Sequence, residues 1–268
     1  MNAEIALRML GVGSAGALEL GCASAVVEVG GAPLLLVDCG WDSLARYERA
    51  YGQPVPPAVF VTHCHMDHVA GLEGLFYRVV VPASGPAPAP VRLYVPVRIV
   101  PTLHARLAQY PSPLAEGGVN FWDAFQIIPV SDAFWHADPR HGPIRFSVFE
   151  ARHHGPGSAY GLALPGAFAY TGDTRPIPET LREVTEGTEL VFHDCRPRGN
   201  PSHSGLDDLE REYRPADRAR MVLYHYATPG EAQQMAAAGY RVAHPGERFV
   251  LAGPRPQPTA TGPRLAAG

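Results

Sequence analysis

The stretch FVTHCHMDHVAGL, residues 60–72, combines an apolar strand end with a dense cluster of metal-binding side chains. His63 and His65 are two positions apart, so in an extended segment both imidazoles face the same way and can bind one ion. Asp67 and His68 follow at once and can turn toward a second ion. Imidazole and carboxylate ligands suit Zn²⁺, Mn²⁺ or Fe²⁺. The sequence therefore predicts a metal site, because a chance grouping is disfavoured by the density of these residues and by their position after a buried strand.

Further ligands are expected at other strand ends, since this cluster cannot complete two ion sites. The segment EARHHGPGSAYG carries His153 and His154, AYTGDT carries Asp173, and LYHYA carries His225. Each polar side chain ends an apolar run, where a buried imidazole or carboxylate needs a partner. We expect these ends to converge on residues 63–68.

Composition indicates an ordinary globular protein. The chain has 268 residues, 46% of them hydrophobic and 18% charged, and strand-like runs alternate with helix-like ones throughout. This pattern predicts an α/β layered domain in which helices cover sheets. We find no linker, so a single domain is expected over residues 1–253. The segment 254–268, rich in Pro, Gly and small residues, is expected to be disordered.

Charge and cysteine content exclude several classes. The formal net charge of −4 disfavours a nucleic-acid binder. The four cysteines form no C-x-x-C pair, which argues against a zinc ribbon or a disulfide framework and favours reduced thiols in a cytoplasmic protein. We see no signal peptide and no apolar run of about 18 residues, so no membrane partner is expected.

From Leu10 to about Leu251 the chain resembles the metallo-β-lactamase-fold hydrolases. The resemblance is carried by the H-x-H-x-D-H motif, the LLVDCG strand end, the TGD turn and the late LYH strand end, in the family's order. It implies a four-layer αββα sandwich with a dinuclear site at one edge of its two sheets. It also implies two divalent ions, with Zn²⁺ favoured and Mn²⁺ or Fe²⁺ acceptable, and a homodimer.

The resemblance also implies a role for each ligand. The first ion would be held by His63, His65 and His153, the second by Asp67, His68 and His225, with Asp173 bridging them. His153 is favoured over His154 because it lies seven positions before Tyr160, a spacing like that of the phosphodiesterase branch. His154 would then contact a metal-binding residue from outside the centre or line the pocket.

The implied nucleophile is a metal-bridging hydroxide, which Asp67 would help to orient. Asp38 is expected to accept an imidazole N–H and fix its tautomer, with a turn cap as the alternative.

Two features favour the phosphodiesterase and ribonuclease Z-like branch. Its bridging residue is an aspartate, like Asp173, which argues against a cysteine-bridged lactamase but not against lactonases. The segments LVFHDC and NPSHSGLDDL resemble a pair of elements in that branch, where His203 matches the general acid and Asp194 the carboxylate that orients it. Asp194 is one methylene shorter than the usual Glu. The alternative is a plain helix start at SHSGLDDL, capped by Ser204.

Spacing indicates the size of the substrate. The short interval between His153 and Asp173 leaves no room for the basic arm with which tRNA-processing enzymes grip RNA. Together with the negative charge, this predicts a small-molecule substrate and no folded nucleic acid. The long interval before His153 holds aromatic and histidine side chains that form either a wall over the metal site or core and dimer interface. They are Phe121, Trp122, Phe125, Phe134, Trp135, His136 and His141.

We therefore expect a dinuclear metal-dependent hydrolase of a small phosphodiester, cyclic or nucleotide-like. The alternative is hydrolysis of a carboxylic ester, lactone or thioester at the same site. A non-enzymatic binding module is disfavoured because such modules usually lose ligands.

Overall fold

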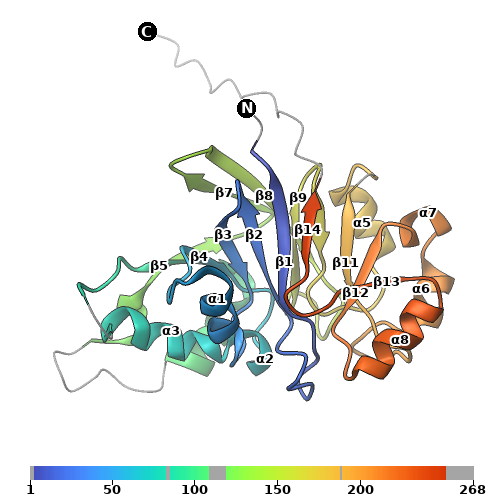
Figure 1. Cartoon of the computed structure of the whole chain (residues 1–268), viewed down its shortest axis with the longest axis horizontal. Coiled ribbons are helices and arrows are strands. Elements are labelled where there is room, and N and C mark those ends of the chain that lie inside the picture. Colours follow the sequence, from blue (N-terminus) through green and yellow to red (C-terminus); the bar gives the residue numbers. More distant parts are fainter. Residues whose placement is uncertain (1–2, 83–84, 109–118, 188, 252–268) are drawn as a thin grey trace, which may run out of the picture.

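Two mixed β-sheets face each other between two layers of helices (Figure 1). The structure, a computed structural model, describes residues 3–82, 85–108, 119–187 and 189–251. The expected disordered segment 254–268 lies outside these residues. Among them, each sheet has seven strands, in the orders β14-β1-β2-β3-β4-β5-β6 and β13-β12-β11-β10-β9-β8-β7. The predicted αββα sandwich is confirmed.

The strands of the first sheet are β14 (Arg248–Leu251), β1 (Ile5–Gly11), β2 (Ser24–Val29), β3 (Ala32–Val37), β4 (Ala58–Phe60), β5 (Val91–Pro96) and β6 (Phe125–Val130). Those of the second are β13 (Arg241–Val242), β12 (Met221–Tyr224), β11 (Leu190–Asp194), β10 (Phe168–Tyr170), β9 (Tyr160–Leu164), β8 (Gly142–Glu150) and β7 (Ala133–Asp138).

Helices α1 (Ser43–Tyr51), α2 (Met66–Val69) and α3 (Gly71–Val80) lie beside the first sheet in Figure 1. Helices α5 (Pro178–Val184), α6 (Leu206–Glu212), α7 (Pro215–Arg218) and α8 (Pro229–Ala237) lie beside the second. Short helical turns are η1 (Val97–Ile99), α4 (Val100–Leu103), η2 (His104–Ala108) and η3 (Phe121–Ala124). In the described part of the chain, no helix is long and apolar enough to cross a membrane.

Helix α1 shows how local sequence sets an element's end. Gly52 follows it with φ of 66°, and its N–H donates to the carbonyl of Glu48 at 2.8 Å. Glycine adopts this left-handed conformation without the clash that a Cβ introduces, so it ends the helix. The helix then buries Leu44 and Tyr47 against the sheet layer.

The core lies between the sheets and is rich in aromatic rings. Phe60 of the first sheet stacks on Phe134 of the second, with ring centroids 6.0 Å apart, and Phe192 meets Phe249 edge-on at 5.0 Å. Each buried phenyl ring contributes about 1.5–3 kcal/mol relative to exposure. These contacts pack the two sheets against each other and so fix how the strand ends of one sheet lie relative to those of the other.

This packing decides between the two readings of the aromatic interval. Phe121, Phe125 and Phe134 belong to the hydrophobic core, so for them the aromatic-wall expectation is wrong. His136 is also buried, with its Nδ1 3.1 Å from the hydroxyl of Tyr94. Trp135 lies on the edge strand β7 and is exposed. Trp122 stacks on His104, and His141 sits at the turn after β7.

Candidate metal centre

The centre forms where parallel strands of both sheets end. Strands β3 and β4 are parallel neighbours in the first sheet, as are β10, β11 and β12 in the second. Their carboxyl ends therefore point to the same edge, the usual place for sites in α/β proteins. Asp38 follows β3, His63 lies shortly after β4, Asp173 after β10 and His225 after β12.

Two of these positions have a strained backbone. Asp38 has φ of 61° and His225 has φ of 71°. Positive φ is uncommon for residues other than glycine and costs on the order of 1–3 kcal/mol. The surrounding packing holds both residues in this conformation, which aims their side chains into the centre.

The structure brings all seven predicted ligands into two groups. Potential ligand atoms lie within 4.8 Å of one another in the group His63, His65, His153 and Asp173, and likewise in the group Asp67, His68 and His225. An Oδ2 of Asp173 lies 3.6 Å from Nε2 of His63 and 3.3 Å from Nε2 of His225. Asp173 therefore stands between the groups, where a bridging ligand is expected.

Outward-facing nitrogens of three imidazoles have protein partners. Nδ1 of His68 lies 2.7 Å from Oδ2 of Asp38, as the sequence suggested for that aspartate. Nδ1 of His153 lies 2.9 Å from the carbonyl oxygen of Ser202, and Nδ1 of His63 lies 3.0 Å from Oγ1 of Thr62. Such partners place the proton on the outer nitrogen and leave Nε2 free for an ion.

Four inward-facing atoms lack such partners. Nε2 of His63, His68 and His225 and Oδ1 of Asp173 are buried without a hydrogen bond among the described residues. Buried polar atoms in native proteins are normally satisfied, so an unpaired cluster needs an explanation. Converging imidazole and carboxylate donors fit divalent ions such as Zn²⁺, Mn²⁺ or Fe²⁺.

Electrostatics of the centre also favour cations. Burial opposes the charge of Asp67, yet the imidazoles of His225 and His68, whose Nε2 atoms lie 3.7 and 3.4 Å from its Oδ2, lower the pKa of its carboxyl. Burial, reinforced by the neighbouring His68, lowers the pKa of His63 well below its usual value. Burial likewise lowers the pKa of His153, to about 4. An ionised Asp67 and neutral His63 and His153 are the protonation states that metal binding requires. At His68 burial opposes the charge, but Asp173 and Asp38 raise the pKa well above its usual value, so an ion that binds there must displace a proton.

His203 is held at the rim by Asp194. Its Nδ1 lies 2.7 Å from Oδ2 of Asp194, and the same oxygen accepts the backbone N–H of Thr174 at 2.8 Å. The ring of His203 stacks on that of His225, with centroids 4.9 Å apart. The shorter aspartate therefore reaches the histidine. Its other oxygen, Oδ1, lies 3.4 Å from Nδ1 of His225.

Other residues near this rim differ from expectation. Helix α6 is capped by Gly205, whereas the hydroxyl of Ser204 donates to the carbonyl of Thr174, so capping by Ser204 is wrong. His193, next to Asp194, turns away and pairs with the hydroxyl of Tyr213 at 2.8 Å. Thr62 and the carbonyl of Ser202 were missed by sequence reasoning. Their only signal was that each adjoins a candidate histidine.

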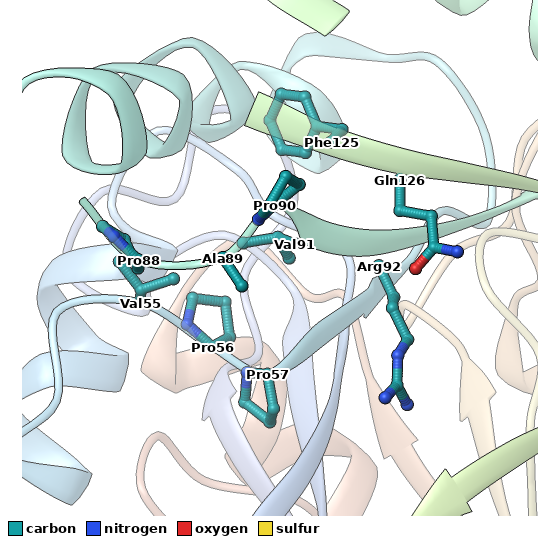
Figure 2. A pocket seen from close by; sticks show the side chains of 10 residues that line it. All are labelled: Val55, Pro56, Pro57, Pro88, Ala89, Pro90, Val91, Arg92, Phe125 and Gln126. Carbon is teal, nitrogen blue, oxygen red and sulfur yellow. The ribbon is translucent and has the colours of Figure 1, made fainter. Parts of the chain in front are cut away.

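A separate hollow is lined by none of the predicted metal ligands (Figure 2). It has a volume of about 740 Å³ and is lined largely by proline and apolar side chains, with Arg92 and Gln126 at one side. Its lining includes Val91 and Phe125, which begin β5 and β6. The hollow therefore lies at the amino ends of the parallel strands β4, β5 and β6, whereas His63 follows the carboxyl end of β4.

Fold and site together define a metal-dependent hydrolase of the metallo-β-lactamase fold. Within it, the chain belongs to the family of the anti-Pycsar protein Apyc1, whose family model matches residues 5–249. The anti-Pycsar protein Apyc1 of Paenibacillus harenae is 26% identical over 252 residues, covering 91% of this chain and 99% of the relative.

Solved structures share the fold. A diphosphatase of the PhnP family superposes with a TM-score of 0.69 at 22% identity, covering 92% of this chain and 99% of its own. The short form of human tRNase Z has a TM-score of 0.58 at 16% identity, covering 91% and 98%. The predicted metallo-β-lactamase fold is thereby confirmed.

Proposed function

We propose that the chain hydrolyses a cyclic nucleotide, a small phosphodiester, at a dinuclear centre. The observation that carries the proposal is the position of Asp173 between two complete ligand groups. The first ion would be held by His63, His65, His153 and Asp173, and the second by Asp67, His68, His225 and Asp173. Zn²⁺ is the ion we favour, and Mn²⁺ or Fe²⁺ also suits these donors.

Each part of the centre has a task in this proposal. When bound, the ions would lower the pKa of a water molecule and offset negative charge on the phosphate. Asp67 would help to orient the attacking water. His203, held at Nδ1 by Asp194, would donate a proton from Nε2 to the departing alkoxide oxygen.

The choice of substrate rests on size and on family. Strands β9 and β10 fill the interval between His153 and Asp173, so no RNA-gripping arm is inserted there. The net charge of −4 also disfavours a polyanion as substrate. Membership of the anti-Pycsar Apyc1 family favours a cyclic nucleotide among small phosphodiesters. The second candidate, a carboxylic ester, lactone or thioester, uses the same site, since an aspartate bridge also serves lactonases.

Three wider proposals accompany this one. Residues 1–253 would act as a single hydrolase domain, because the described hydrophobic core includes residues of both sheets. The protein would be cytoplasmic, with four buried thiols that are free of disulfides in the structure. It would also form a homodimer, which light scattering on the purified protein can test.

The proposal is tested by ion content and a substrate panel. We expect two ions per chain by elemental analysis, and turnover of 3′,5′-cyclic nucleotides and of bis(p-nitrophenyl) phosphate. A lactone and aryl-ester panel run beside them would give little turnover. Activity on the ester panel alone would overturn the phosphodiesterase assignment. A His65→Ala variant that loses its ions yet keeps full activity would overturn the metal mechanism.

A further inference from the structure

His65 differs from the neighbouring histidines in the partner of the ring nitrogen that faces away from the ligand group. Its Nδ1 lies 3.2 Å from Nε2 of His153, so that nitrogen faces the first ligand group. Its Nε2 lies 3.0 Å from Nε2 of His154, an exposed residue that belongs to neither ligand group. The outer partner of His65 is thus another imidazole, whereas His63, His68 and His153 use a hydroxyl, a carboxylate and a carbonyl.

An ion at Nδ1 of His65 would fix the direction of this hydrogen bond. A neutral imidazole that offers one nitrogen to an ion carries its proton on the other nitrogen. With Nδ1 of His65 facing the ion, Nε2 of His65 is the donor and Nε2 of His154 is the acceptor. The rings meet edge-on, with centroids 4.9 Å apart and planes at 69°, so the contact is a directed one.

The loop that carries His154 is itself braced. The backbone N–H of Gly157 donates to the carboxylate of Glu150, and the hydroxyl of Ser158 donates to the carbonyl of Gly155 at 2.6 Å. Gly157 has φ of 74°, and a Cβ there would lie 2.7 Å from Nη1 of Arg98. The two hydrogen bonds hold this turn, which sets the consecutive residues His153 and His154 against the two nitrogens of His65.

We propose that His154 is a positioning residue that orients His65 for the first ion. The inference rests on the proposed dinuclear function and adds a residue to it. Partners behind metal-binding histidines typically contribute 10- to 100-fold in metal affinity. His154 would act through His65 and touch neither the ion nor the substrate.

Two substitutions separate the hydrogen bond from simple bulk. His154→Phe keeps a ring but removes the acceptor, whereas His154→Gln keeps an acceptor. His244→Phe is the matched control, since His244 is also exposed and donates its backbone N–H to Glu247, away from the centre. Ion stoichiometry and affinity would be measured on ion-free protein by titration with Zn²⁺ against a competing chelator. Thermal unfolding of each ion-free variant would check the fold.

We expect His154→Phe to lower the affinity for one of the two ions by about 10- to 100-fold, while the other ion binds as before. His154→Gln should recover much of that affinity, and His244→Phe should match the wild type. The inference is overturned if His154→Phe binds both ions as the wild type does, or if His154→Gln binds no better than His154→Phe. A wild-type chain that binds fewer than two ions would overturn the proposed dinuclear function and this inference together, so the two failures are distinguishable.

Discussion

Two buried clusters of charged groups involve the first sheet, and they are built in opposite ways. In the first cluster, Glu28 of β2 accepts from Nε of Arg8 at 2.8 Å, from the hydroxyl of Tyr51 at 2.7 Å and from Nε of Arg248 at 2.6 Å. In the metal centre, four inward-facing atoms, Nε2 of His63, His68 and His225 and Oδ1 of Asp173, have no hydrogen-bond partner among the described residues. A cluster whose atoms pair with one another stabilises the fold, whereas convergent unpaired atoms provide a binding site.

Protonation reflects the same difference. Burial opposes ionisation of Glu28, but hydrogen bonds from Arg8 and Arg248 lower the pKa of its carboxyl. In the metal centre, burial opposes the charge of His225, but Asp173 and Asp194 raise its pKa to about 10. Ion binding at His225 must therefore displace a proton, and affinity at this position should rise with pH. Glu28 needs no outside partner.

The largest expected effect comes from removing the carboxylate that both ligand groups share. Asp173→Ala should abolish binding of at least one ion and reduce kcat/KM for bis(p-nitrophenyl) phosphate by about 1,000-fold or more. Bound ions offset several kcal/mol of transition-state charge, and each 1.36 kcal/mol is about tenfold in rate. Elemental analysis and steady-state kinetics measure both. Two tightly bound ions and normal turnover in Asp173→Ala would show that Asp173 is not the bridging ligand.

The next effect separates proton donation from ion binding. His203→Ala should lower kcat for a cyclic nucleotide by about 100- to 1,000-fold, because a general acid assists a poor leaving group. A nitrophenolate leaving group needs no proton, so bis(p-nitrophenyl) phosphate should be affected much less.

Ion content is the control for His203, since Asp173, His203 and His225 also form a group that could hold an ion. His203→Ala should retain both ions. Loss of an ion would show that His203 is a ligand rather than a proton donor.

A smaller effect on ion affinity is expected from changing Asp38, the partner of His68. Asp38→Asn weakens the contact at Nδ1 of His68 and should reduce the affinity of the second ion by about 10- to 100-fold. Asp138→Asn is the matched control, because that buried carboxylate serves the turn after β7. Chelator competition measures both variants. If Asp38→Asn and Asp138→Asn bound the second ion with equal affinity, Asp38 would have a purely structural role.

The smallest functional effect is expected at Glu28. Glu28→Gln should leave ion content and turnover unchanged and lower the free energy of unfolding at pH 7 by about 1–3 kcal/mol, through lost charged hydrogen bonds. Since folding lowers the pKa of Glu28, its contribution is present above the usual glutamate pKa of about 4.3 and disappears as pH falls through the folded value.

Urea unfolding of ion-free protein at pH 7 and in mild acid measures this contribution. The difference between Glu28→Gln and wild type should shrink in acid. A difference that grows as the pH falls would contradict the account of the Glu28 cluster.

Much of the architecture could be predicted because it is encoded in local patterns. A glycine after a helix-like run is a local signal for a helix end, and Gly52 has the left-handed backbone that ends α1. The interior packing could not be read in the same way. Aromatic residues before His153 suit either a pocket wall or a core, and only the pairing of Phe134 with Phe60 across the sheets decided between them.

By itself the sequence determined which side chains could bind ions, because chemistry and spacing are local properties. Four of the candidates are neighbours in the chain: His63, His65, Asp67 and His68. The remaining candidates could be recognised because each is a polar residue at the end of an apolar, strand-like run. Only the tertiary structure decided which atoms face inward and what stands behind them. Asp173 lies between two ligand groups, and His154 lies behind His65. Those relations depend on how two sheets and their loops pack, and such long-range contacts leave no periodic signal in the chain.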